Sequence, residues 1–275
     1  MKLSLGFSTC PNDTFIFDAM VHQRIDTEGL DFDLVMEDVE KLNKMAYNAD
    51  LDITKISFHA YAYIADKYKI LNSGSALGRN NGPLLISKKK IYPDEVPFLK
   101  IGIPGKNTTA NLLLHVAYPE LKTLKEYVFS DIEEAILENE IDAGLIIHET
   151  RFTYQKRGLK KIIDLGEYWE ETSEKPVPLG GIIVNRNLSS EIQQKIDRVI
   201  RRSINYAFNK PSDSLEFIKR FAQEMDEQTM FKHIDLYVNN YTKELGKEGK
   251  ESIELLLKKA VELNFVNSLP DDIFV

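Results

Sequence analysis

His148 is the residue of this sequence best suited to acid–base chemistry. It directly follows the apolar run 144–147, so its imidazole should emerge where a buried strand ends. An imidazole titrates near neutral pH and accepts a proton at modest cost, which is what a general base must do. The alternative is an ordinary histidine hydrogen-bonded at a strand end, because a well-placed histidine marks an active site only in some proteins.

A second group of polar residues lies in the stretch 8–15, with the sequence Ser-Thr-Cys-Pro-Asn-Asp-Thr-Phe. The alternating run 3–7 before it predicts a strand, and the apolar pattern 15–21 after it predicts a helix. Pro11 suits the first helical position, and Asp13 complements the helix dipole. Two interpretations are open: a capped strand-to-helix junction, or a cradle whose unpaired amides bind a carboxylate or phosphate.

Two further stretches place polar groups at the ends of predicted strands. Lys55 would be costly to bury alone, so it should reach solvent, a partner or an anionic ligand, and Ser57 ends the same expected strand. The loop 105–109 precedes a predicted helix and offers hydroxyls and free amides to a carboxylate or a hydroxyl-rich ligand. A plain helix cap explains this loop equally well. His59, two residues after Ser57, is the second histidine that we expect near these groups.

Motifs that would indicate a cofactor are missing. The loop 105–109 lacks the glycine spacing of a Walker loop and has Asn107 where the Mg²⁺-binding hydroxyl should stand. Residues 148–152 lack the second histidine of a zincin helix, and no Gly-x-Ser-x-Gly elbow occurs. We therefore expect no metal and no nucleotide cofactor. Cys10 has no histidine beside it in the sequence, so we favour a contact or packing role over a nucleophilic one.

These residues need a scaffold, and the hydrophobic pattern predicts one. Up to about residue 90 it alternates strands with helices, which favours a parallel sheet covered by helices. The expected strands in this part are 30–36, 52–57, 75–78 and 84–87, and the expected helices are 39–47 and 58–67. Further on we expect strands 100–103, 127–129, 143–147 and 179–184, and helices 108–117 and 131–139, followed by four helical patterns up to residue 266.

Two proline-marked crossings, 93–97 and 176–178, bracket a self-contained series of strands and helices. We therefore predict an α/β protein of two lobes with a central ligand cleft. Residues 1–97 plus 176–275 form the large α/β lobe with a helical C-terminal part, and residues 98–175 form a smaller inserted α/β lobe. Such an arrangement can close on a ligand by hinge motion. Ligands of open α/β sheets bind at the carboxyl ends of strands, where the candidate residues lie.

The composition excludes several classes of partner. A net charge of -8 over 275 residues is unsuited to binding a phosphate backbone, and the densest basic run, 88–90, is soon followed by acidic residues. We therefore expect no nucleic-acid partner. We also expect no membrane partner, because no run of about 18 apolar residues is found, and no secretory signal pattern occurs. A single cysteine excludes an intrachain disulfide and suits a cytoplasmic protein.

Several of these stretches together resemble the 1,4-dihydroxy-6-naphthoate synthases of the futalosine route to menaquinone. They are 8–15, 55–57, 75–79 with 82–83, 144–149 and 178–181, in order along nearly the whole chain. Each is short, but the combination is specific. The resemblance implies a type II periplasmic-binding-protein-like fold and a small-molecule substrate that carries a carboxylate, cyclic dehypoxanthinyl futalosine. It also implies a cofactor-free lyase reaction that releases 1,4-dihydroxy-6-naphthoate and a three-carbon fragment.

The same resemblance assigns roles to single residues. His148 matches the proton acceptor of the family, and the matching substrate-binding turns contain Lys55, Ile56, Ser57, Thr108 and Thr109. We add Cys10, Asn12 and Asp13, because the stretch 8–13 should form the floor of the cleft opposite His148. One departure is Thr9, where many relatives carry a proline, which loosens that turn slightly.

Two alternatives stay open at this point. Chorismate dehydratase shares the fold and the pathway, but the first motif and His148 favour the synthase. A non-catalytic solute-binding protein with this fold would close on a small carboxylate without changing it. The missing signal pattern and the placed histidine weigh against that class. A homodimer is the assembly that we consider.

Overall fold

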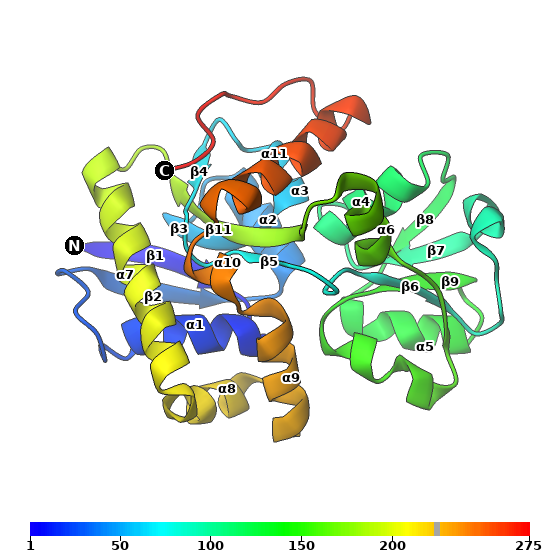
Figure 1. Cartoon of the computed structure of the whole chain (residues 1–275), viewed down its shortest axis with the longest axis horizontal. Coiled ribbons are helices and arrows are strands. Elements are labelled where there is room, and N and C mark those ends of the chain that lie inside the picture. The colour runs from blue at the N-terminus through cyan, green and yellow to red at the C-terminus, as the bar shows by residue number, and fades with distance from the viewer. Residues whose placement is uncertain (223–225) are drawn as a thin grey trace.

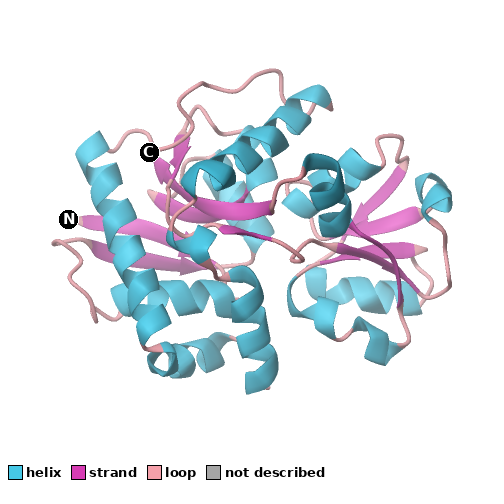
Figure 2. Ribbon diagram, in the orientation of Figure 1, coloured by secondary structure: helices cyan, strands magenta, loops and turns pink. Residues whose placement is uncertain are grey.

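Two sheets with their covering helices form two lobes that lie side by side (Figures 1 and 2). This computed structural model describes residues 1–222 and 226–275, and it describes only the backbone of His148 and Glu149. The α/β class and the two-lobed organisation agree with the prediction. No helix within the described ranges has both the length and the apolar character needed to span a bilayer.

The first sheet has six strands, in the order β2-β1-β3-β11-β4, with β5 also paired to β11. The strands are β1 (Lys2–Phe7), β2 (Asp31–Met36), β3 (Ile53–Ser57), β4 (Tyr68–Ile70), β5 (Ala76–Gly78) and β11 (Val177–Asn185). β1 runs parallel to β2 and β3, whereas β11 runs antiparallel to β3, β4 and β5. β4 and β5 therefore run in the same direction as β1, β2 and β3, and β11 is the one strand of this sheet that runs the opposite way. The predicted parallel pairing is observed between β1, β2 and β3, whereas β4 and β5 pair with β11, which returns from the second lobe.

The second sheet has five strands in the order β10-β6-β9-β7-β8. They are β6 (Leu84–Ser87), β7 (Lys100–Ile103), β8 (Thr123–Glu126), β9 (Ala143–Ile146) and β10 (Lys160–Asp164). The predicted strand 127–129 is wrong. Pairing with β7 spans Thr123–Glu126 and ends there, and Val128 is 60% exposed.

Helices cover both sheets. They are α1 (Pro11–Val21), α2 (Val39–Tyr47), α3 (Phe58–Ala62), α4 (Thr109–Ala117), α5 (Ile132–Leu137), α6 (Leu165–Ser173), α7 (Ser190–Asn209), α8 (Leu215–Phe221), α9 (Glu227–Tyr237), α10 (Asn240–Lys243) and α11 (Gly246–Glu262). Short 3-10 helices are η1 (Pro93–Phe98), η2 (Phe129–Asp131), η3 (His148–Phe152), η4 (Tyr154–Arg157) and η5 (Pro211–Ser214). In the first lobe α1 packs with α7, α8 and α9 on one face of the sheet, and α11 packs with α3 on the other (Figure 1).

Three helix predictions differ from the structure. The helix expected at 58–67 ends at Ala62, where the chain turns toward β4, and the one expected at 131–139 is the shorter α5 preceded by η2, with no side-chain cap. The region after β11 contains five α-helices in its described part rather than the four expected. Short amphipathic segments such as α10 are too brief for a helical period to stand out in the sequence.

The first crossing between the lobes lies at residues 79–83, not at the predicted 93–97. β6, which the sequence analysis assigned to the first lobe, pairs with β9 and β10 in the second sheet. The inserted lobe therefore begins before residue 98. Pro93 and Pro97 instead belong to η1, because fixed proline dihedrals suit a tight surface turn as well as a stiff linker.

The two lobes also share packed side chains. One continuous buried apolar cluster includes Ile56 and Ile183 of the first sheet together with Leu85 and Leu145 of the second. The contact between α3 and α4 lies along this shared side. The hinge motion that the sequence analysis expects stays a prediction.

Candidate active site

A cavity between the lobes brings together most of the predicted site residues. It contains about 700 Å³ of empty space, counting the part that opens to solvent. Seven of the predicted residues line it: Asn12, Asp13, Lys55, Ile56, Ser57, Thr108 and Thr109. Both lobes contribute, because the two threonines begin α4 of the second lobe and the other five belong to the first.

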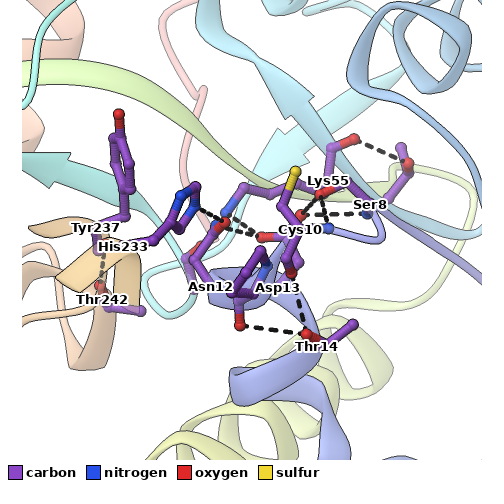
Figure 3. A network of polar contacts seen from close by, with 12 residues as sticks. Ser8, Cys10, Asn12, Asp13, Thr14, Lys55, His233, Tyr237 and Thr242 are labelled. Carbon is purple, nitrogen blue, oxygen red and sulfur yellow. Dashed lines mark hydrogen bonds and ion pairs between the residues drawn. The ribbon is translucent and has the colours of Figure 1, made fainter. Parts of the chain in front are cut away.

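Lys55 is buried and forms an ion pair with Asp13 (Figure 3). Its Nζ lies 3.2 Å from Asp13 Oδ1 and donates to the Gly74 carbonyl at 3.0 Å. The Asp13 carboxylate also accepts hydrogen bonds from the Ser8 amide at 3.2 Å, the Ser8 hydroxyl at 2.7 Å and the Asn12 amide at 2.8 Å. The sequence analysis expected Lys55 to reach solvent, a partner or an anionic ligand, and the structure shows a buried partner, Asp13.

The same network reaches the C-terminal helices. His233 on α9 is fully buried, and its Nε2 lies 2.9 Å from Asn12 Oδ1 (Figure 3). One turn later on the same helix, Tyr237 lines the cavity. α9 thus ties the turn after β1 to a wall of the cavity and holds Asn12 in a fixed orientation.

Ser57 is held by a chain of hydrogen bonds that crosses between the lobes. Asn43 accepts from the Ser57 amide at 3.0 Å and donates to Glu40 at 3.1 Å, and Glu40 accepts from Asn107 of the second lobe at 2.9 Å. Burial raises the pKa of the Glu40 carboxyl above its usual value, against the lowering effect of the hydrogen bond from Asn43. Gly105 makes this approach possible, because a side chain there would collide with Glu40.

The N-terminus of α4 forms the cavity wall of the second lobe, opposite the first-lobe residues described above. The Thr108 hydroxyl caps the helix by accepting from the Asn111 amide, and the Thr109 hydroxyl donates to the Leu179 carbonyl of β11. The hydroxyls are therefore committed to protein partners. The first amides of a helix have no intrahelical acceptor, and those of Thr109 and Ala110 begin α4 where both residues line the cavity. This end of α4 suits an anionic group.

The part of the cavity surface that β11 forms contains Gly180, which has no side chain to fill the cavity. Gly180 on β11 faces Ser57 on β3, and a Cβ atom at this position would lie 2.4 Å from the Ile56 carbonyl oxygen. No rotamer change can relieve a collision with backbone. Gly180 therefore keeps β11 close to β3 and leaves the space above it open for a ligand.

Two predicted contacts differ from the structure. Cys10 is the N-cap of α1 and half-buried, but it is not among the cavity-lining residues. His59 does not reach the cavity either. It is fully buried behind Thr108, with Nδ1 3.2 Å from the Thr108 carbonyl oxygen and its ring packed against Phe265.

The burial of His59 predicts an acid-sensitive fold. Burial lowers the pKa of His59 to about 4, whereas an unfolded histidine titrates near 6.5. Between these values the unfolded chain binds the additional proton, so the free energy of unfolding should fall as the pH falls from about 6.5 to about 4. His59→Gln removes this contribution. Urea titrations at pH 7 and pH 4.5 should show a smaller loss of stability for the variant than for the wild type, and equal losses would contradict the assignment.

The side chain of His148 lies outside the described part of the structure, so its role stays a prediction. The backbone places His148 at the start of η3, directly after Ile147, which lines the cavity. α9 packs against η3 from the first lobe. The residue predicted to be the base therefore follows the cavity wall of the second lobe.

The structure also places residues in the cavity that the sequence analysis did not select. Asn81 and Pro83 come from the crossing segment, Val39 begins α2, and Tyr237 ends α9. Asn81 had the appearance of an ordinary turn residue within Asn-Asn-Gly-Pro. Tyr237 carries no local signal, since only the packing of α9 against the first motif brings it to the site.

Comparisons with known proteins agree with this architecture. A family model described as menaquinone biosynthesis matches residues 3–262. A Thermus thermophilus protein named 1,4-dihydroxy-6-naphthoate synthase is 39% identical over 273 residues, which is 99% of each chain. A crystal structure of an Archaeoglobus fulgidus protein has a TM-score of 0.91 at 35% identity, covering 96% of this chain and 98% of that one. A Candida albicans protein described as having the generic periplasmic binding protein fold has a TM-score of 0.70 at 12% identity, covering 99% and 93%.

Proposed function

This chain belongs to the menaquinone biosynthesis family, and we propose that it converts cyclic dehypoxanthinyl futalosine to 1,4-dihydroxy-6-naphthoate. The proposal covers the reaction as well as the pathway: a cofactor-independent carbon–carbon lyase that releases a three-carbon fragment. The observation that carries it is the convergence of three separate sequence stretches, 12–13, 55–57 and 108–109, on one cavity between the lobes.

In the proposed mechanism His148 is the general base. A neutral imidazole takes a proton from the substrate, which starts ring opening and cleavage of the carbon–carbon bond. The aromaticity of the naphthoate then favours the later steps. Closure of the two lobes on the substrate would exclude water from the cavity, which strengthens the electrostatic interactions inside it.

We place the carboxylate of the substrate at the N-terminus of α4. Lys55 is the cationic side chain among the described residues that line the cavity, but its charge is offset by Asp13 at 3.2 Å. The amides of Thr109 and Ala110 carry the positive end of the helix dipole and have no such counter-ion in the described contacts. A carboxylate there gains charge-assisted hydrogen bonds without breaking an existing ion pair.

This placement predicts that the charge of a ligand matters. We expect 2-naphthoate to inhibit competitively with an inhibition constant ~10-fold to ~100-fold lower than that of 2-naphthamide, the range expected for hydrogen bonds to a charged group. Steady-state inhibition by the two compounds measures the difference. Equal constants would show that the cavity does not select the carboxylate.

The reaction itself is tested by offering the purified protein two substrates without added metal or nucleotide. The proposal predicts that cyclic dehypoxanthinyl futalosine is consumed and the naphthoate appears, while chorismate is unchanged. Consumption of chorismate would favour the dehydratase of the same pathway. Binding of the first compound without any product would favour a solute-binding role, which the fold alone also allows.

The location and assembly of the protein are further parts of the proposal. We place the protein in the cytoplasm, because a single unbridged cysteine suits a reducing compartment. A homodimer is the assembly that we consider, and sedimentation of the purified protein would test it.

A further inference from the structure

The side chain of Asn81 is buried in the cavity wall without a polar partner. Only 1% of the residue is exposed, and it lines the cavity. Within the described residues, neither Asn81 Oδ1 nor Asn81 Nδ2 has a hydrogen-bond partner. Buried amides are nearly always paired, because an unpaired one loses its bonds to water without compensation.

The neighbours of Asn81 are all held in place. The guanidinium of Arg79 lies 3.5 Å from Glu170 and 3.2 Å from Glu248. Asn80 has a left-handed backbone with φ of 59°, and its amide donates to Glu170 at 2.7 Å. On the other side the Gly82 carbonyl accepts a hydrogen bond from Arg151 of η3.

Close packing adds to these polar contacts. A Cβ atom on Gly82 would lie 2.2 Å from the backbone of Gly166, and one on Gly78 would lie 2.9 Å from Asn81 Nδ2. The segment that carries Asn81 is therefore fixed by charge pairs, a hydrogen bond and glycine contacts on both sides. Its single unpaired polar group is presented by a rigid support, which is how a binding residue is best held.

We propose that Asn81 binds a neutral, hydroxyl-bearing part of the substrate. An amide offers a donor and an acceptor side by side, so a hydroxyl or a hydroxyketone can pair with both. A carboxylate would use only the donor and would be repelled by the amide oxygen. This inference rests on the proposed function and assigns the cavity two ends: the α4 terminus for the carboxylate, and Asn81 for a neutral polar group.

Asn81→Leu tests the inference, because leucine has a similar size and no polar atoms. We expect the KM for cyclic dehypoxanthinyl futalosine to rise ~10-fold to ~100-fold, the range for leaving substrate hydrogen bonds unmade. The affinity for 2-naphthoate, which has a carboxylate and no hydroxyl, should stay within about twofold. The Tm of the free protein should not fall, since no partner of Asn81 is lost.

Asn43→Leu is the matched comparison for stability. Asn43 is equally buried, but it bonds to Glu40 and to Ser57, so its replacement should lower the Tm. A Tm loss in Asn81→Leu equal to that of Asn43→Leu, with an unchanged KM, would overturn the inference. An equal loss of affinity for 2-naphthoate and for the substrate would also overturn it.

An incorrect reaction and an incorrect role for Asn81 can be distinguished experimentally. A wild-type protein that makes no product contradicts the reaction, and calorimetric binding of cyclic dehypoxanthinyl futalosine to wild type and Asn81→Leu then decides the role of Asn81. An affinity loss confined to that compound supports the inference. Equal affinities contradict it.

Discussion

Replacing His148 with asparagine is expected to slow turnover at least ~100-fold while substrate still binds, which is the typical effect of removing a general base. Asparagine keeps a polar side chain of similar size but cannot take up a proton near neutral pH. Single-turnover kinetics measures the chemical step, and calorimetry measures the dissociation constant. We expect the loss in kcat and little change in affinity.

The matched variant is His22→Asn. His22 follows α1 at the surface, with a side chain that is 42% exposed, and it pairs with Asp18 outside the cavity. Its kcat should equal that of the wild type. Unchanged turnover in His148→Asn would remove His148 from the mechanism and leave the base unassigned.

Lys55→Met should destabilise the protein by about 3–5 kcal/mol, because it leaves the Asp13 carboxylate buried without its cation. The side chains of Lys55 and Asp13 are 8% and 2% exposed, so the lost charge interaction is a largely desolvated one. Urea unfolding of the wild type and the variant measures this free energy. The same variant should also disturb Ser8 and Asn12, which bond to the same carboxylate.

Two further variants control this experiment. The double variant Asp13→Asn with Lys55→Met removes both charges and should recover part of the lost stability, since no uncompensated charge remains buried. Lys41→Met breaks an exposed ion pair with Glu37 and should leave the Tm almost unchanged. A Lys55→Met variant as stable as Lys41→Met would show that the buried pair does not hold the turn after β1.

The sequence predicts the fold best where a local pattern and its end signals agree. The helix expected at 39–47 is observed with the same bounds, because Asp38 caps it by accepting from the Glu40 and Lys41 amides. Pro11 also occupies the first turn of α1 as predicted. The short β4 and β10 were missed because three to five residues give little periodicity, and their pairing partners are distant in the chain.

Prediction of the lobe crossing failed for a related reason. Prolines at 93 and 97 suggested a stiff linker, whereas the actual crossing is the segment 79–83, which contains the Asn-Asn-Gly-Pro turn. Whether β6 belongs to the first or the second sheet is set by its pairing with β9 and β10. Such pairing depends on tertiary contacts that no local pattern contains.

The candidate site was predictable in part. Residues with a strand-end position and polar chemistry, such as Lys55 and Thr108, do line the cavity, although their binding roles stay predictions. Cys10 and His59 satisfy the same sequence criteria but do not line it: Cys10 is the N-cap of α1, and His59 is buried with its Nδ1 next to the Thr108 carbonyl. Asn81 and Tyr237 could not be selected, since only the assembled lobes bring them to the site.

A crystal structure of His148→Asn soaked with cyclic dehypoxanthinyl futalosine would show both the binding site and the position of the base. We expect intact substrate in the cavity between the lobes, with its carboxylate at the first amides of α4 and residue 148 beside the carbon that loses a proton. Substrate bound elsewhere, or 1,4-dihydroxy-6-naphthoate formed in the crystal without the histidine, would contradict it.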